Sequence, residues 1–107
     1  MSWWISLCEN EKPCVVEAFE EGGTQALGGS TDADLNVTYN YGKHFRFPNL
    51  AGMTGEQSIP LLSDAVERLG VERDADYWAP TEGNVGYACA ILLSWARQYP
   101  AATWCVS

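Results

Sequence analysis

The chain has 107 residues, of which 47% are hydrophobic and 12% aromatic, and its formal net charge is −8 at pH 7. A chain of this length builds one hydrophobic core, so we expect a single domain over residues 1–107. The composition excludes a disordered chain. The acidic balance argues against general binding to nucleic acid or to an anionic membrane.

Sequence signals for membrane insertion or export are weak. No apolar run approaches the roughly 18 residues that a membrane-spanning helix needs. The first ten residues lack a basic region and already contain Glu9, which is not the pattern of a signal peptide. We therefore expect a cytoplasmic protein.

The first third of the chain predicts strands. Residues 3–7, "WWISL", and 14–19, "CVVEAF", are rich in β-forming residues and flank a polar turn, so they predict a hairpin. Two glycine pairs then frame residues 24–27, "TQAL", a candidate short strand. Residues 33–41, "ADLNVTYNY", predict a strand, and from position 36 onward polar and apolar residues alternate, which gives it one polar and one apolar face.

Two helices follow. Apolar residues recur at helical spacing from 59 to 69, and Gly70 suits the C-terminal cap. Pro60 fits best in the first turn, which starts the helix near position 59. The alternative is a capping box of Thr54 and Gln57, with Pro60 bending the helix from inside.

The second helix begins after Thr81, carries an apolar stripe from Val85 to Tyr99, and ends at Pro100. Residues 102–106, "ATWCV", predict a last strand. The order of elements indicates an α+β fold: a mostly antiparallel sheet of four to five strands with two helices on one face.

The four cysteines fall in no C-x-x-C pair, and in a reducing cytosol we expect them to be thiols that pack as small apolar side chains. Cys8 and Cys14 are expected to face each other across the hairpin, close enough to bridge on oxidation. A zinc site of Cys8, Cys14, Cys105 and His44 is the alternative. Its spacing matches no known ligand pattern, so we expect no metal.

Residues 36–47, "NVTYNYGKHFRF", gather basic and aromatic residues in an acidic chain. An arginine fork suits phosphate or carboxylate, aromatic rings offer stacking surfaces for a base, and amides and hydroxyls give directional hydrogen bonds. The segment therefore suits a small anionic aromatic ligand, with nucleotides the obvious class. The competing interpretation is that the aromatics are core, the amides hold loops, and the cations pair with Asp32, Asp34 or Glu20.

A second candidate site is the start of the second helix, where free backbone N–H groups favour an anion and Trp78 lies just upstream for stacking. Helix capping alone also explains Thr81 and Glu82. The complete set of candidate ligand-binding residues is Asn36, Thr38, Tyr39, Asn40, Tyr41, Lys43, His44, Arg46, Trp78, Thr81 and Asn84.

Catalysis has little support in the sequence. His44 is the only histidine, and no serine or cysteine motif identifies it as a base. We expect a non-enzymatic protein without a cofactor.

The chain resembles a family of small proteins encoded by tailed phages and prophages, for which no activity is settled. The segments that carry the resemblance are "GGT" (22–24), "GGST" (28–31), "LNVTYNYGKHF" (35–45), "GMTGEQSIPLL" (52–62), "YWAPTEGN" (77–84) and "LLSWARQYP" (92–100). The resemblance implies a phage origin and the cytoplasm of a bacterial host. Small phage proteins of this kind often counter host defence, by sequestering nucleotide second messengers or by blocking a defence protein.

The leading hypothesis is accordingly a protein that sequesters a nucleotide-type immune signal, cyclic or derived from ADP-ribose, in pockets formed between subunits of a homo-oligomer. The alternative is an acidic inhibitor that occupies a basic surface of a host nuclease or CRISPR complex. A phage accessory protein without a defence role is the third. The acidic residues available to the inhibitor are Glu9, Glu11, Glu17, Glu20, Glu21 and the 72–76 run.

Overall fold

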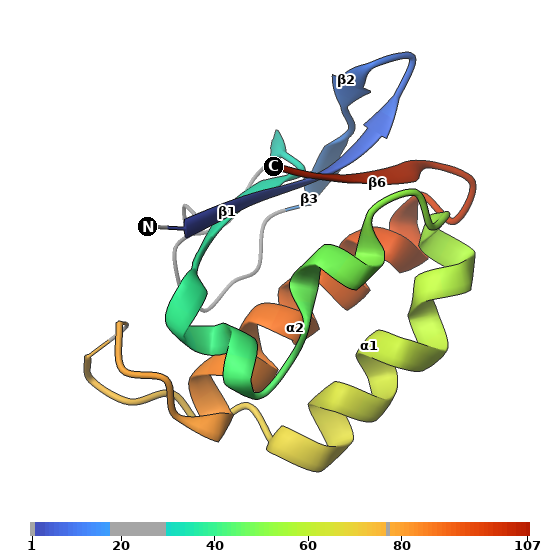
Figure 1. The fold of residues 1–107 in the computed structure, drawn as a ribbon. Coiled ribbons are helices and arrows are strands. Elements are labelled where there is room, and N and C mark those ends of the chain that lie inside the picture. Colours follow the sequence, from blue (N-terminus) through green and yellow to red (C-terminus); the bar gives the residue numbers. More distant parts are fainter. Residues whose placement is uncertain (1, 18–29, 77) are drawn as a thin grey trace.

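The computed structural model describes residues 2–17, 30–76 and 78–107. An antiparallel sheet covers one side of two helices, α1 (Gly55–Leu69) and α2 (Glu82–Gln98), which confirms the predicted α+β fold (Figure 1). The strand predicted at 24–27 lies outside the described residues. In the part of the chain that is described, no helix has the length and apolar character needed to cross a membrane.

The main sheet is built around β1 (Ser2–Glu9), and all its ladders are antiparallel. One edge of β1 pairs with β6 (Thr103–Val106). The other edge pairs first with β5 (Asp34–Thr38) and, farther along, with β2 (Lys12–Pro13). The first and last strands of the chain are therefore neighbours, with β1 at the centre of the sheet and β6 at its edge.

The predicted hairpin forms, but only its first part stays paired. Pro13 lies opposite Cys8, and the N–H of Cys14 still donates to the carbonyl of Leu7 at 2.8 Å. The chain then turns away, because the carbonyl of Cys14 accepts from Ala33 at 2.8 Å while Ala33 accepts from Leu7 at 3.0 Å. From this junction β3 (Val15–Glu17) pairs with β4 (Ser30–Asp32) as a separate ribbon.

This register corrects the expectation that Cys8 and Cys14 face each other. Cys14 lies opposite Leu7, and both side chains are buried. Successive side chains of a strand point to opposite faces, so Cys8 projects from the other face of the sheet. The neighbour of Cys8 on that face is Cys105, on β6.

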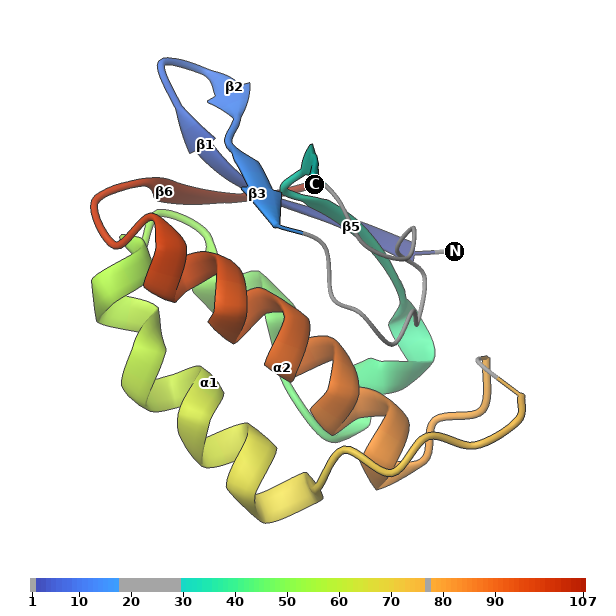
Figure 2. The ribbon, with the colours of Figure 1, turned by 180° about the vertical axis from the view of Figure 1, so that it is seen from behind.

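The two helices lie side by side on one face of the sheet, as both views show (Figure 1, Figure 2). Alternate residues of the strands point into the layer between sheet and helices, which is the physical origin of the core. The largest fully buried side chains there include Trp95, Trp104, Tyr41, Phe47 and Leu62. Trp104 donates from its indole nitrogen to Ser58 at 2.7 Å, which satisfies that polar group inside the core.

The first helix begins earlier than the preferred prediction. Thr54 caps α1 with a complete capping box to Gln57, in which the two hydrogen bonds measure 2.9 and 3.1 Å. Pro60 consequently lies inside the helix, and the alternative start is the right one. The capping box satisfies two N–H groups, which helps to offset the hydrogen bond that an internal proline cannot make.

The strand predicted at 33–41 forms as β5 but ends at Thr38. The hydroxyl of Thr38 accepts from the N–H of Asn40 at 3.4 Å and thereby starts a 3₁₀ helix, η1 (Tyr39–Lys43). Threonine competes with a strand ladder in this way because its side chain offers a local acceptor. A second 3₁₀ helix, η2 (Phe47–Leu50), follows, and the alternation of faces is lost after Thr38.

Candidate functional site

An exposed aromatic ring marks the start of η1. Tyr39 is 45% exposed, and its ring lies 4.8 Å from that of Trp3, at an interplanar angle of 53°. Trp3 in turn contacts the buried ring of Phe47 at 5.8 Å. Gly42 makes room for this stack, because a Cβ there would lie 2.8 Å from the Trp3 ring. One face of Tyr39 is thus supported by the core while its exposed surface remains open to a ligand.

His44 ties three segments together. Its Nε2 lies 3.0 Å from the carbonyl of Pro80, and since a carbonyl can only accept, this nitrogen carries the proton. The backbone carbonyl of His44 accepts from the guanidinium of Arg68, near the end of α1, at 3.3 Å. His44 therefore links the end of η1 both to the 70–81 connector and to α1.

Basic residues precede and follow this histidine in the sequence, and one more contacts its backbone. Lys43 and Arg46 are exposed on either side of His44, and Arg68 is held against its carbonyl. These are three of the six Lys and Arg residues of the chain. We call Tyr39, Lys43, His44, Arg46 and Arg68 the basic–aromatic face.

Arg68 was missed by sequence analysis because it lies 24 residues after the residue that it contacts. The one signal in the sequence was its place in the last turn of α1, where a basic residue already complements the helix dipole. Because the helix dipole already explains a basic residue at this position, the contact of Arg68 with His44 was not expected from the sequence.

Two predicted ligand contacts are corrected by burial. Tyr41 has no exposed surface, so it belongs to the core and offers no stacking face. Phe45 and Phe47 are buried beside it, with ring centroids 4.8 Å apart. For these three rings the competing interpretation, that the aromatics are core, is the right one.

Asn84 is the second correction. It is only 4% exposed, and its side chain holds the connector in place. The amide oxygen accepts from the N–H of Asp74 at 2.8 Å, and the amide nitrogen donates to the carbonyls of Asp76 and Ala79 at 3.0 and 2.8 Å. An amide with these partners is committed to the loop and is not available to a ligand.

The other predicted residues at this end of the molecule differ in accessibility. Thr81 caps α2 by accepting from the N–H of Asn84 at 3.1 Å, which is the capping role weighed against anion binding. Trp78 is 57% exposed, and its backbone N–H donates to Asp76 at 3.0 Å. The bond from His44 to Pro80 brings this loop to the basic–aromatic face, so Trp78 remains a candidate for stacking.

The polar residues of β5 are used in hydrogen bonds within the protein. Asn36 donates to the hydroxyl of Ser2 at 2.7 Å and to the carbonyl of Trp3 at 3.2 Å, which links β5 to β1. Thr38 is buried and caps η1. Asn40 is exposed within η1 and is the one of these three polar residues that lies beside Tyr39 at the surface.

The thiols do not form a metal site. Among the described residues, no three His, Cys, Asp or Glu side chains gather in a way that would hold a metal ion, so the zinc alternative is not supported. Burial raises the pKa of Cys89 to about 12. Burial and the neighbouring Cys105 raise the pKa of Cys8 to about 11. Both groups are protonated near neutral pH and are therefore poor nucleophiles.

The chain matches no family model, no curated protein and no solved structure.

Proposed function

We propose that the protein binds a small anionic ligand of nucleotide type on the basic–aromatic face and holds it without chemical conversion. The observation that carries this proposal is the exposed ring of Tyr39, which packs against Trp3 in a short segment that also exposes Lys43 and Arg46, in a chain of net charge −8. Aromatic rings stack on bases whatever their sequence. Guanidinium groups bind phosphate through paired hydrogen bonds.

These residue types suit a ligand that carries both an anionic group and an aromatic ring. Arg46 supplies a planar fork and Lys43 a compact charge, and both are exposed. Arg68 adds a further cation, since its guanidinium already contacts the carbonyl of His44. Because the rest of the chain has an excess of acidic residues, this face is where we expect an anion to be attracted.

The biological role that we propose is sequestration of a nucleotide-type immune signal in an infected bacterium. Its support is the resemblance of the segments at 35–45 and 77–84 to tailed-phage proteins. Both segments contribute to the neighbourhood of His44. Homo-oligomers that enclose the ligand between subunits belong to this proposal.

Thermal unfolding with a panel of cyclic nucleotides and ADP-ribose derivatives tests the proposal. At about 100 Kd a ligand stabilises the folded state by about 2.7 kcal/mol, which raises Tm by roughly 10 °C for a chain of this size. Arg46→Ala and Tyr39→Ala should abolish the shift. Chromatography of the bound fraction should recover the ligand unchanged.

Arg97→Ala and Trp4→Ala are the matched controls. Arg97 is an exposed cation in the last turn of α2, and Trp4 is an exposed ring on β1. Both variants should keep the full shift. The proposal fails if no nucleotide of the panel raises Tm, or if the control variants lose the shift as fully as the two test variants do.

A second candidate function is direct inhibition of a host nuclease or CRISPR complex, which the β1–β2 hairpin favours. The hairpin projects from the body of the molecule in both views (Figure 1, Figure 2), and Glu9 and Glu11 are exposed at its tip. Under this hypothesis a purified basic effector binds the protein at low salt and loses binding in Glu9→Lys with Glu11→Lys. Lys12→Ala, at the same tip, is the control that should still bind.

A further inference from the structure

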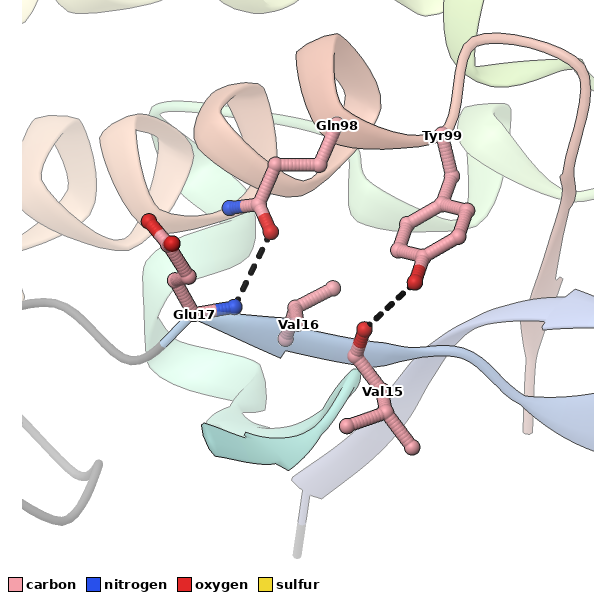
Figure 3. A pocket seen from close by; sticks show the side chains of 5 residues that line it. All are labelled: Val15, Val16, Glu17, Gln98 and Tyr99. Atoms are coloured by element: carbon pink, nitrogen blue, oxygen red, sulfur yellow. Dashed lines mark hydrogen bonds between the residues drawn. The ribbon is translucent and has the colours of Figure 1, made fainter. Parts of the chain in front are cut away.

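The edge of β3 is hydrogen-bonded to side chains in the place where another strand would lie. The N–H of Glu17 donates to the amide oxygen of Gln98 at 2.9 Å. Two residues back, the carbonyl of Val15 accepts from the hydroxyl of Tyr99 at 2.7 Å. Figure 3 shows both bonds spanning the space between β3 and the end of α2. An N–H and a carbonyl at this spacing are the groups that an edge strand offers to a neighbouring strand.

The same residues line an open cavity. Its volume is about 460 Å³, and its walls are Val15, Val16, Glu17, Gln98 and Tyr99. This volume lies within the range of ligand-binding clefts. Val16 points toward α2 and is buried, whereas Gln98 is exposed and Tyr99 is half-buried (Figure 3). The two side chains that cap β3 are thus accessible to solvent, while the strand that they cap is anchored in the core.

We propose that an extended, lysine- or arginine-containing peptide of a partner protein adds to the edge of β3 and takes over the two hydrogen bonds made by Gln98 and Tyr99. A peptide bond offers the same carbonyl that the Gln98 amide presents to Glu17. It also offers an N–H in place of the Tyr99 hydroxyl at Val15. Strand addition of this type draws its affinity from main-chain bonds.

The charge of the occupant follows from the groups around the cavity. Glu17 stands at its wall, and the C-terminal end of α2, where the helix dipole is negative, forms the opposite side. Arg97 is the basic residue of that last turn but is not among the residues that line the cavity. A cationic side chain next to Glu17 is therefore favoured over an anionic one.

Displacement of Gln98 and Tyr99 from β3 by a peptide should cost the folded state little stability. Gln98 and Tyr99 form these bonds near solvent, so they regain hydrogen bonds with water when a peptide displaces them. The backbone groups of Val15 and Glu17 remain satisfied throughout. The site also lies at the opposite end of α2 from the basic–aromatic face, and a helix of 17 residues separates the two by about 25 Å. The peptide site at β3 is therefore distinct from the proposed nucleotide site.

The test uses a fluorescent, capped heptapeptide in which lysine alternates with valine, titrated with the full chain and followed by fluorescence anisotropy. We expect saturable binding that weakens at least tenfold in Glu17→Pro, which removes the N–H on the side facing away from β4. Proline is tolerated at such an edge position. Glu17→Ala keeps the N–H and is the matched control, so it should lose only the smaller, salt-dependent part of the affinity.

Gln98→Ala with Tyr99→Phe should bind the peptide several-fold more tightly, because the competing caps are gone. The same peptide with N-methylated bonds at alternate positions should bind at least tenfold more weakly, and this measurement requires no variant to fold. Equal binding of the N-methylated peptide, equal binding by Glu17→Pro, or no saturable binding to either the natural chain or the double variant would each overturn the proposal.

Discussion

Each end of α2 carries a side-chain amide that hydrogen-bonds to the backbone of another segment, but one amide is buried and the other is exposed. At the N-terminal end the amide of Asn84 is buried and bonds to three backbone groups of the connector. At the C-terminal end the amide of Gln98 is exposed and bonds to the backbone of Glu17. Loss of a buried partner leaves backbone groups unsatisfied, whereas an exposed partner is replaced by water. Burial therefore makes one amide structural and leaves the other replaceable by a ligand.

Asn84→Ala should give the largest effect. It removes the partners of the Asp74 N–H and of two carbonyls at once, so we expect the free energy of unfolding to fall by about 2–4 kcal/mol. Gln98→Ala, the matched amide deletion, should cost less than about 0.5 kcal/mol. Urea denaturation of both variants measures the difference. Equal losses would show that burial does not distinguish the two ends.

Gly86→Ala tests how closely the connector approaches the N-terminal half of α2. A Cβ at Gly86 would overlap the backbone carbonyl of Gly70, which is not the flexible end of a side chain. Overpacking of this kind costs about 1–3 kcal/mol. Ser94→Ala, in the last two turns of the helix, should change stability by less than about 0.5 kcal/mol. Thermal unfolding of the two variants compares the halves, and an unchanged Tm in Gly86→Ala would contradict the close approach.

Cys89 lies between the two ends of α2, and its burial makes the free energy of unfolding depend on pH. Burial raises its pKa from 9.0 to about 12, so above pH 9 the unfolded chain loses a proton that the folded chain keeps. The resulting stabilisation is complete below pH 9 and declines as the pH rises toward 12. At pH 10 the loss should be about 1 kcal/mol.

Cys89→Ala is the comparison for this measurement, because it removes that one thiol and leaves the other titratable groups in place. We expect its unfolding free energy to fall less steeply than that of the natural chain between pH 8.5 and pH 10.5. Parallel pH profiles would mean that the thiol is not kept protonated by the fold.

The helices were the most predictable part of the fold. The spacing of apolar residues placed α2 between Thr81 and Pro100, and the capping threonine is where the sequence indicated. The start of α1 was ambiguous because both Pro60 and the Thr54–Gln57 box are start signals. The structure decides for the box, since its two hydrogen bonds outweigh the preference of a proline for the first turn.

The candidate site was only partly predictable. Tyr39 and Tyr41 are two residues apart and look equivalent in an alternating pattern, yet one is exposed and the other fully buried. The difference arises because Thr38 starts a 3₁₀ helix, in which residues two apart no longer share a face. Arg68 and the contact of His44 with Pro80 join segments distant in the chain, and no local pattern encodes such contacts.

By itself the sequence determined the fold class, the two helices, the net charge and the segment in which basic and aromatic residues are interleaved. These are properties of composition and of short-range periodicity, which neighbouring residues set among themselves. Three features depend on the packing of distant segments: which rings of that segment are exposed, the hydrogen bonds of Asn84 to the connector, and the hydrogen bonds from side chains at the end of α2 to β3. The physical reason is that burial and partner choice depend on residues far apart in the chain, which meet only when the sheet and the helices pack.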